Sequence, residues 1–247
     1  MSLVDKIEIP RRTMVLFFVI DTSGSMDGNK IGAVNTAIEE VIPAIKEVSN
    51  ENSDAQIKIA ALTFSSGATW ITKNGPIEAD QFRWNYLDAS GVTDFGAALK
   101  TLNDKLSTKE FMKEATGSFA PAIFLLSDGD PTDEWERSLA ELKQNNWFKA
   151  AVKVAIAIGD DANKEVLKAF TGSIEAVLET HSAVALKKMI KFVSVRASQV
   201  ASKSANVTDG TFNADLGDEQ KQQELNASLA EFQNEVAAAP DLTDEDW

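Results

Sequence analysis

The chain of 247 residues contains no cysteine and a single histidine, His181. The first absence excludes disulfide frameworks, cysteine nucleophiles and thiolate metal sites, and the scarcity of histidine excludes a metal centre built from several imidazoles. No apolar run is longer than residues 14–20, whereas a helix that crosses a bilayer needs about 20 residues. The first residues also lack a basic-then-apolar signal pattern. We therefore expect a cytoplasmic protein that does not engage membranes.

Positive charge is also scarce, because 24 basic residues face 38 acidic ones and the formal net charge is −14. Residues 206–247 hold eleven acids and one lysine, Lys221, so this segment alone contributes −10. The sequence shows no basic stripe with interleaved aromatic residues, and an acidic tail repels a phosphate backbone. These features argue against a nucleic-acid partner.

Apolar runs alternate with segments of helical periodicity along residues 1–205. Runs that are apolar throughout are typical of strands buried on both faces of a parallel sheet. We predict strands at 14–21, 57–64, 120–127, 152–158 and 174–178, and helices at 30–49, 93–106, 133–146, 162–170 and 182–202. Residues 68–72 are predicted to form one antiparallel edge strand. This alternation predicts an α/β fold of three layers, with a doubly wound, mostly parallel sheet.

The pattern changes near residue 205, so we divide the chain into a domain at 1–205 and an acidic C-terminal part at 206–247. Residues 206–217 read as a linker. Residues 218–238 favour a helix whose apolar stripe consists of Leu225, Leu229, Phe232 and Val236. Such a helix either docks on the domain or awaits a partner.

Oxygen-bearing side chains gather where the predicted strands end. Ligand sites of open α/β sheets lie beyond the carboxyl ends of the strands, and here three loops, 21–26, 90–94 and 127–133, supply carboxylates and hydroxyls. Each acid or hydroxyl taken alone could serve as a helix cap or a turn residue, and Thr132 or Asp133 is expected to cap the helix at 133–146. Together they predict an all-oxygen site, which suits Mg²⁺ or Mn²⁺ and suits Ca²⁺ less well. Two carboxylates, two serine hydroxyls and a threonine hydroxyl from these loops could converge on one point.

This D-x-S-x-S run, followed by a lone threonine and a later aspartate, resembles the metal-ion-dependent adhesion site of von Willebrand factor A domains. Residues 93–99 (TDFGAAL) and 126–129 (LSDG) support the resemblance, which covers about residues 12–203. It implies that the ion is contacted, directly or through water, by Asp21, Ser23, Ser25, Thr93 and Asp128. It also implies that an aspartate or glutamate of a partner protein completes the coordination.

Within the family, residues 127–133 and the compact length resemble bacterial cytoplasmic TerY-type proteins, which are associated with tellurium-resistance and stress operons. The sequence adds three acids close to the site, Asp27, Asp94 and Asp130, and a tryptophan, Trp135. We regard these four as candidates for a partner contact or for the surroundings of the ion. The extra acids should raise cation affinity and repel a carboxylate while no ion is bound.

The leading hypothesis is a metal-dependent protein-binding module without enzymatic activity. The alternative is a Mg²⁺-dependent phosphohydrolase in which Asp21 is the nucleophile; no lysine is clearly placed for a phosphoryl group, and Lys30 is the nearest. A third hypothesis concerns the tail, because an acid among residues 241–246 could reach the ion of its own or a neighbouring molecule and give autoinhibition or self-association.

Overall fold

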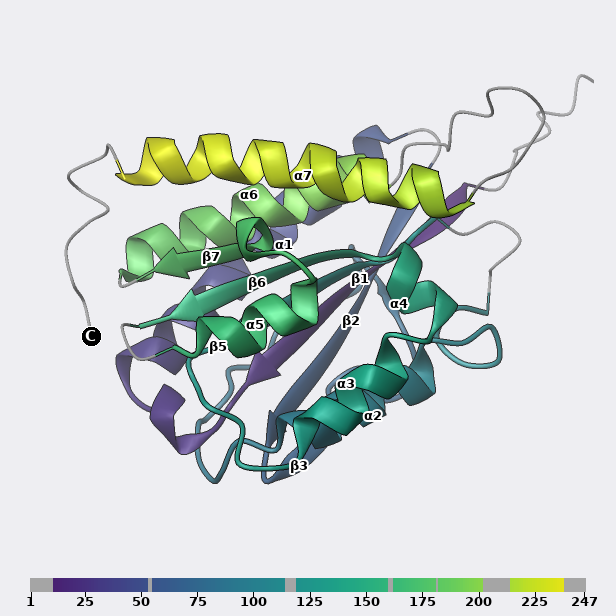
Figure 1. Cartoon of the computed structure of the whole chain (residues 1–247). Coiled ribbons are helices and arrows are strands. Elements are labelled where there is room, and N and C mark those ends of the chain that lie inside the picture. The colour runs from purple at the N-terminus through teal and green to yellow at the C-terminus, as the bar shows by residue number, and fades with distance from the viewer. Residues whose placement is uncertain are drawn as a thin grey trace, which may run out of the picture.

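The structure is a computed structural model, and it describes residues 11–52, 55–113, 119–159, 162–180, 182–201 and 214–237 (Figure 1). His181, the linker up to residue 213 and the acidic end from residue 238 lie outside this description. Within the described residues, no helix is long and apolar enough to cross a membrane.

A seven-stranded sheet forms the middle layer, in the order β3-β2-β1-β5-β6-β7, with β4 also paired to β2. The strands are β1 (Arg12–Asp21), β2 (Ala55–Ser65), β3 (Gly67–Trp70), β4 (Ile77–Glu78), β5 (Ala122–Ser127), β6 (Val152–Ile158) and β7 (Val177–Thr180). Five strands run parallel, and β3 and β4 are antiparallel to β2. The predicted α/β fold with a mostly parallel sheet and an antiparallel edge strand is confirmed, and β4 adds a second antiparallel pairing.

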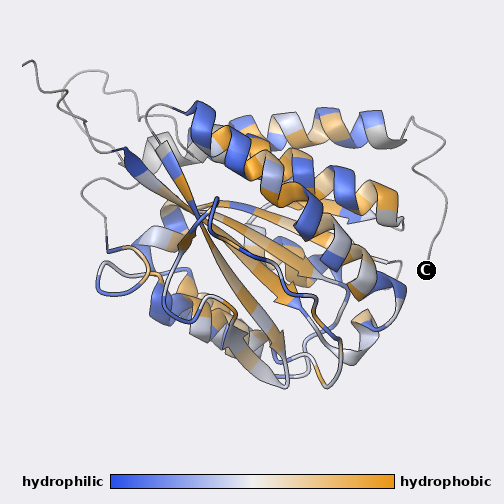
Figure 2. Cartoon of the chain, turned by 180° about the vertical axis from the view of Figure 1, so that it is seen from behind, coloured by the Kyte–Doolittle hydropathy of each residue, from blue (hydrophilic) through white to orange (hydrophobic). Residues whose placement is uncertain are grey.

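Helices cover both faces of this sheet. They are α1 (Asn29–Glu51), α2 (Phe95–Lys105), α3 (Trp135–Leu142), α4 (Asn146–Ala150), α5 (Lys164–Thr171), α6 (Ala183–Ala201) and α7 (Ala214–Ala237). One core lies between the sheet and α1 with α6, and the other lies under α2, α3 and α5. Along β1, Leu16 and Phe18 belong to the first core and Val15 and Phe17 to the second. The central strand is therefore apolar on both faces, and hydrophobic residues run along the strands in Figure 2.

Two predicted elements require correction. The single helix expected at 133–146 is wrong, because α3 ends at Leu142 and α4 begins at Asn146. Lys143 ends the first helix, and Asn145 caps the second, since its Oδ1 accepts a hydrogen bond from the Trp147 amide at 2.8 Å. The strand expected at 174–178 begins only at Val177, after a 3₁₀ turn.

Helix α7 docks on the body of the domain (Figure 1). Leu225 and Leu229 are buried in the core that α6 also lines, and the ring of Phe232 stacks on that of Phe192 with centroids 4.1 Å apart. Of the two alternatives that the sequence left open, docking is the one observed. The division of the chain at residue 205 stays a prediction.

Candidate metal site

The topology brings the first and third predicted loops together. Strand β1 lies between β2 and β5, so the chain order reverses beside it, and ligand sites of doubly wound sheets form at such a point. Asp21 is the last residue of β1, and Asp128 directly follows β5. The two carboxylates therefore stand at the carboxyl ends of neighbouring strands.

Asp21 is fully buried. Its Oδ1 accepts a hydrogen bond from the Ser23 amide at 2.8 Å, and its Oδ2 accepts one from Ser127 Oγ at 2.6 Å. Burial raises the pKa of the Asp21 carboxyl, and the hydrogen bonds from Ser127 and Ser23 oppose that rise. A divalent cation beside Asp21 would favour the charged form of this carboxyl.

The serines of the first loop connect to the second carboxylate. Ser25 Oγ donates to Asp128 Oδ1 at 2.8 Å, and the hydroxyls of Ser23 and Ser25 lie 3.1 Å apart. Lys30 Nζ lies 2.6 Å from Asp128 Oδ2, with 13% of the lysine side chain exposed and none of the aspartate's. Sequence reasoning considered Lys30 only as a partner for a phosphoryl group. Lys30 lies in the first turn of α1, directly after the loop that carries Ser23 and Ser25, and this position in the sequence could have indicated that it contacts the site.

The three loops converge above Gly129. A methyl group in the Cβ position of Gly129 would lie 3.5 Å from Asp21 Oδ2, 3.5 Å from Thr93 Oγ1 and 3.6 Å from Ser25 Oγ. Oxygen atoms of Asp21, Ser25 and Thr93 thus surround one point. Because residue 129 is a glycine, no side chain occupies that point.

The loop that carries Thr93 is held by Thr132 and Asp133, which the sequence analysis expected to cap the helix that follows them. The Thr93 amide donates to Thr132 Oγ1 at 3.0 Å, and the Thr132 amide donates to the Thr93 carbonyl at 2.9 Å. Asp133 accepts hydrogen bonds from the amides of Gly96 and Ala97 at 2.9 and 3.0 Å. The expectation that Thr132 or Asp133 caps the helix after it is therefore wrong, because these side chains hold the start of α2 and place Thr93.

Gly96 permits this contact between the two segments. A Cβ at Gly96 would lie 2.9 Å from Asp133 Oδ2 and 3.1 Å from the Glu134 carbonyl oxygen. A side chain at this position would push the loop that carries Asp133 away from α2.

The other four candidates make contacts elsewhere or lie exposed. Asp94 accepts a hydrogen bond from the Gly67 amide at 2.8 Å and so holds the turn between β2 and β3. Asp130 accepts one from the Asn163 side chain, and Asp27 is exposed. Trp135 is half-buried, and its ring packs on Phe95 with centroids 6.1 Å apart.

The donor set fits a hard divalent cation. It consists of two carboxylates and three hydroxyls, with no nitrogen or sulfur, which is the ligand chemistry of Mg²⁺ or Mn²⁺. Among the residues that the structure describes, no three acids or histidines cluster as a metal group, so the hydroxyls are essential to the set. The residues that would hold the ion are Asp21, Ser23, Ser25, Thr93 and Asp128. A bound ion would act as a Lewis acid toward an incoming oxygen ligand.

Fold and site together define a doubly wound α/β domain with a candidate cation site at its switch point. The family model of the von Willebrand factor type A domain matches residues 16–192, so the chain belongs to this family. No curated protein sequence matches the chain significantly.

Solved structures share the fold at low sequence identity. The von Willebrand factor type A protein from Catenulispora acidiphila is 17% identical with a TM-score of 0.56, over 75% of this chain and 43% of that one. Proximal thread matrix protein 1 from the mussel byssus, whose metal-ion-dependent adhesion site (MIDAS) motif is occupied by zinc, is 21% identical with a TM-score of 0.54. The match covers 76% of this chain and 46% of that one. The pilus adhesin SpaC from Lactobacillus rhamnosus GG is 15% identical with a TM-score of 0.59, over 75% and 30%. The chain thus spans less than half of each of these structures.

Proposed function

We propose that this protein is a protein-binding module that depends on a divalent cation, and that an aspartate or glutamate of its partner completes the coordination of the ion. The single observation that carries the proposal is the convergence of Asp21, Thr93 and Ser25 oxygens around the point above Gly129. The metal-bearing site of the mussel relative supports a metal in this position. Because the donors are all oxygen, we assign Mg²⁺ or Mn²⁺ before Ca²⁺.

Binding rather than catalysis is the role that the site supports. Asp21 is fully buried, and both of its carboxylate oxygens already accept hydrogen bonds. Oδ1 is held by the Ser23 amide and Oδ2 faces the point to which the ion is assigned, so neither oxygen is left to attack a phosphoryl group, and a nucleophilic role for Asp21 is disfavoured. An ion held by few carboxylates and several hydroxyls keeps an open position for an outside ligand.

Calorimetric titration with Mg²⁺ and Mn²⁺ tests the metal. We expect one-to-one binding that Asp21→Ala abolishes and that Asp104→Ala leaves within twofold. Asp104 is a matched control because its carboxylate is exposed and lies 3.5 Å from Lys100 at the surface. Equal metal binding by Asp21→Ala and the wild type would refute the assigned site.

Peptides selected from a random library in the presence of Mg²⁺ test the partner. We expect each binding peptide to require one aspartate or glutamate, and its exchange for asparagine or glutamine to abolish binding. Binding that survives removal of the ion, or that needs no acid, would overturn the bridging role.

We place the partner in a bacterial tellurium-resistance or stress-response system on the basis of the TerY-type resemblance of residues 127–133. A strain in which the gene is deleted should tolerate less tellurite, and a copy with Asp21→Ala should fail to restore tolerance. Restoration by that copy would separate the physiological role from the metal site.

A further inference from the structure

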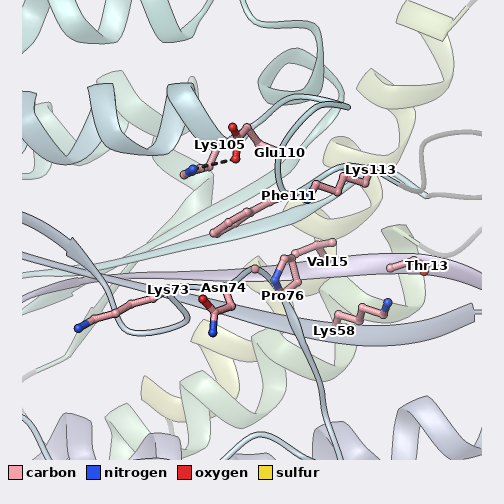
Figure 3. A pocket seen from close by; sticks show the side chains of 11 residues that line it. Thr13, Val15, Lys58, Lys73, Asn74, Pro76, Lys105, Glu110, Phe111 and Lys113 are labelled. Carbon is pink, nitrogen blue, oxygen red and sulfur yellow. Dashed lines mark hydrogen bonds and ion pairs between the residues drawn. The ribbon is translucent and has the colours of Figure 1, made fainter.

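A cavity of about 230 Å³ lies away from the metal site (Figure 3). Thr13 and Val15, near the start of β1, contribute to its wall, whereas Asp21 ends the same strand. A strand rises about 3.3 Å per residue, so six to eight residues of β1 separate the two places by roughly 20–26 Å. The cavity therefore cannot share a small ligand with the metal site.

The cavity is basic although the chain is acidic. Four lysines from separate segments line it, against one acid, Glu110; the lysines are Lys58 in β2, Lys73 after β3, Lys105 at the end of α2 and Lys113 in the turns that follow α2. The formal charge of these five groups is +3, whereas the whole chain carries −14. Positive charge is thus concentrated here against the overall trend, as expected for a site that attracts an anion.

Contacts within the lining account for part of this charge. Glu110 Oε2 lies 2.7 Å from Lys105 Nζ, and in the sheet register Lys58 stands opposite Glu78. The hydrogen bond from Lys105, the charge of Lys105 and then that of Lys113 hold the pKa of Glu110 below its ordinary value. Glu110 thus offsets one of the four ammonium groups of the lining, and the exposed Lys73 and Lys113 add positive charge to it.

The wall of the cavity is apolar where Val15 and Phe111 lie. The Phe111 ring is 8% exposed and packs edge-on against Trp70, with centroids 4.7 Å apart. Lys105 Nζ stands 5.5 Å from the centre of the same ring. In Figure 3, Lys58 and Thr13 lie at one end of the lining and Lys73 at the other, and Phe111 lies between Lys105 and Lys113. A ligand that fits this lining combines an anionic group with a small apolar or aromatic part.

We propose that the cavity lined by Lys58, Lys73, Lys105, Lys113 and Phe111 binds a small organic phosphate monoester. A dianion gains from several ammonium groups at once, and lysine binds phosphate as a point charge. The volume is below the 300–1,000 Å³ that is usual for drug-sized ligands, so the ester is small. A polymeric polyanion is disfavoured, because it would also meet the negative charge of the rest of the chain.

Calorimetric titration with phenyl phosphate tests this site. The protein is first freed of metal on a chelating resin, so that no bound ion competes for the phosphate. We expect one-to-one binding that is at least tenfold tighter than that of phenol or of inorganic phosphate. Binding that does not saturate would overturn the proposal, and inorganic phosphate that binds as tightly as phenyl phosphate would overturn the assignment of an organic ester.

Two double variants locate the binding. Lys73→Gln with Lys113→Gln should raise the Kd for phenyl phosphate at least tenfold, because both side chains are exposed members of the lining. Lys100→Gln with Lys143→Gln, which removes the same charge from exposed positions outside the cavity, should change the Kd less than twofold. An equal loss of affinity in the two double variants would show that overall charge, and not the cavity, determines binding, and it would overturn the site. Asp21→Ala should bind phenyl phosphate as the wild type does, and loss of binding in that variant would move the ligand to the metal site.

Discussion

The ion pair between Lys30 and Asp128 predicts that the protein competes with its own metal. Lys30 Nζ lies 2.6 Å from Asp128 Oδ2, at a carboxylate with no exposed surface. At an effective dielectric constant near 20 the attraction is about 6 kcal/mol, and desolvation offsets part of it. Removing one partner of a buried pair typically costs about 3–5 kcal/mol, and because 13% of the lysine side chain is exposed we take the lower value, about 3 kcal/mol.

The perturbation is Lys30→Met, which keeps much of the side-chain length and removes the charge. Without metal, its free energy of unfolding should fall by about 3 kcal/mol, measured by urea denaturation. Its Mg²⁺ Kd should fall 10- to 100-fold, because the ion no longer displaces an ammonium group and each tenfold change corresponds to about 1.4 kcal/mol. Lys30→Arg keeps the charge and should bind Mg²⁺ within threefold of the wild type.

A matched control is Lys187→Met, which removes a lysine paired with Glu40 at the surface. Surface pairs contribute less than about 1 kcal/mol, so both measurements should stay near those of the wild type. If Lys30→Met binds Mg²⁺ no more tightly than the wild type, the lysine does not compete with the ion and the reasoning is refuted.

Three further predictions concern the supports of the two sites. Gly129→Ala should weaken Mg²⁺ binding at least tenfold and leave the melting temperature nearly unchanged, because the added methyl group fills the point between the ligands at ordinary contact distances of 3.5 Å and more; unaltered Mg²⁺ affinity in calorimetry would contradict it. Asp133→Ala should lower the free energy of unfolding by about 1–2 kcal/mol, as for a lost helix cap, and a urea midpoint equal to that of the wild type would count against this role. The pKa of Glu110, followed by NMR, should lie below its ordinary value of 4.5 and rise in Lys105→Gln. Since the folded pKa is the lower one, the stabilisation from this pair is present above the unfolded pKa and is lost as the pH falls through the folded pKa; an unshifted pKa in the wild type would show that the pair does not form.

Much of the fold could be predicted because the decisive signals are local. The central strands are buried on both faces, so they appear as continuous apolar runs, and the strand predicted at 152–158 matches β6 residue for residue. The split between α3 and α4 was missed because residues 143–146 are polar and compatible with a helix, and only the side-chain bonds of Asn145 reveal the new start. Strand β4 has two residues, which is too short for a periodic pattern.

The candidate site divides in the same way. Its oxygen donors could be predicted because they follow strand ends whose order is visible in the sequence. The contacts that position them could not, because they join residues far apart in the chain. Lys30 meets Asp128 across 98 positions, and Asp133 holds Gly96 across 37. No local pattern distinguishes an aspartate that caps its own helix from one that caps the neighbouring helix.

The charges around the site give a physical reason why partner binding should need the metal. Asp21 and Asp128 carry two negative charges when ionised, and Lys30 supplies one positive charge in the structure. A carboxylate that approaches this face without an ion therefore meets net negative charge, to which the exposed Asp27 and Asp130 add. A divalent cation balances the charge of the two buried carboxylates and has a coordination position open for an oxygen of the partner. Lys30 is already paired with Asp128 and provides no such coordination position. Affinity for an acidic partner should accordingly follow occupancy of the ion site. Substitution of a residue that holds the ion should lower this affinity more than substitution of a surface acid around the site.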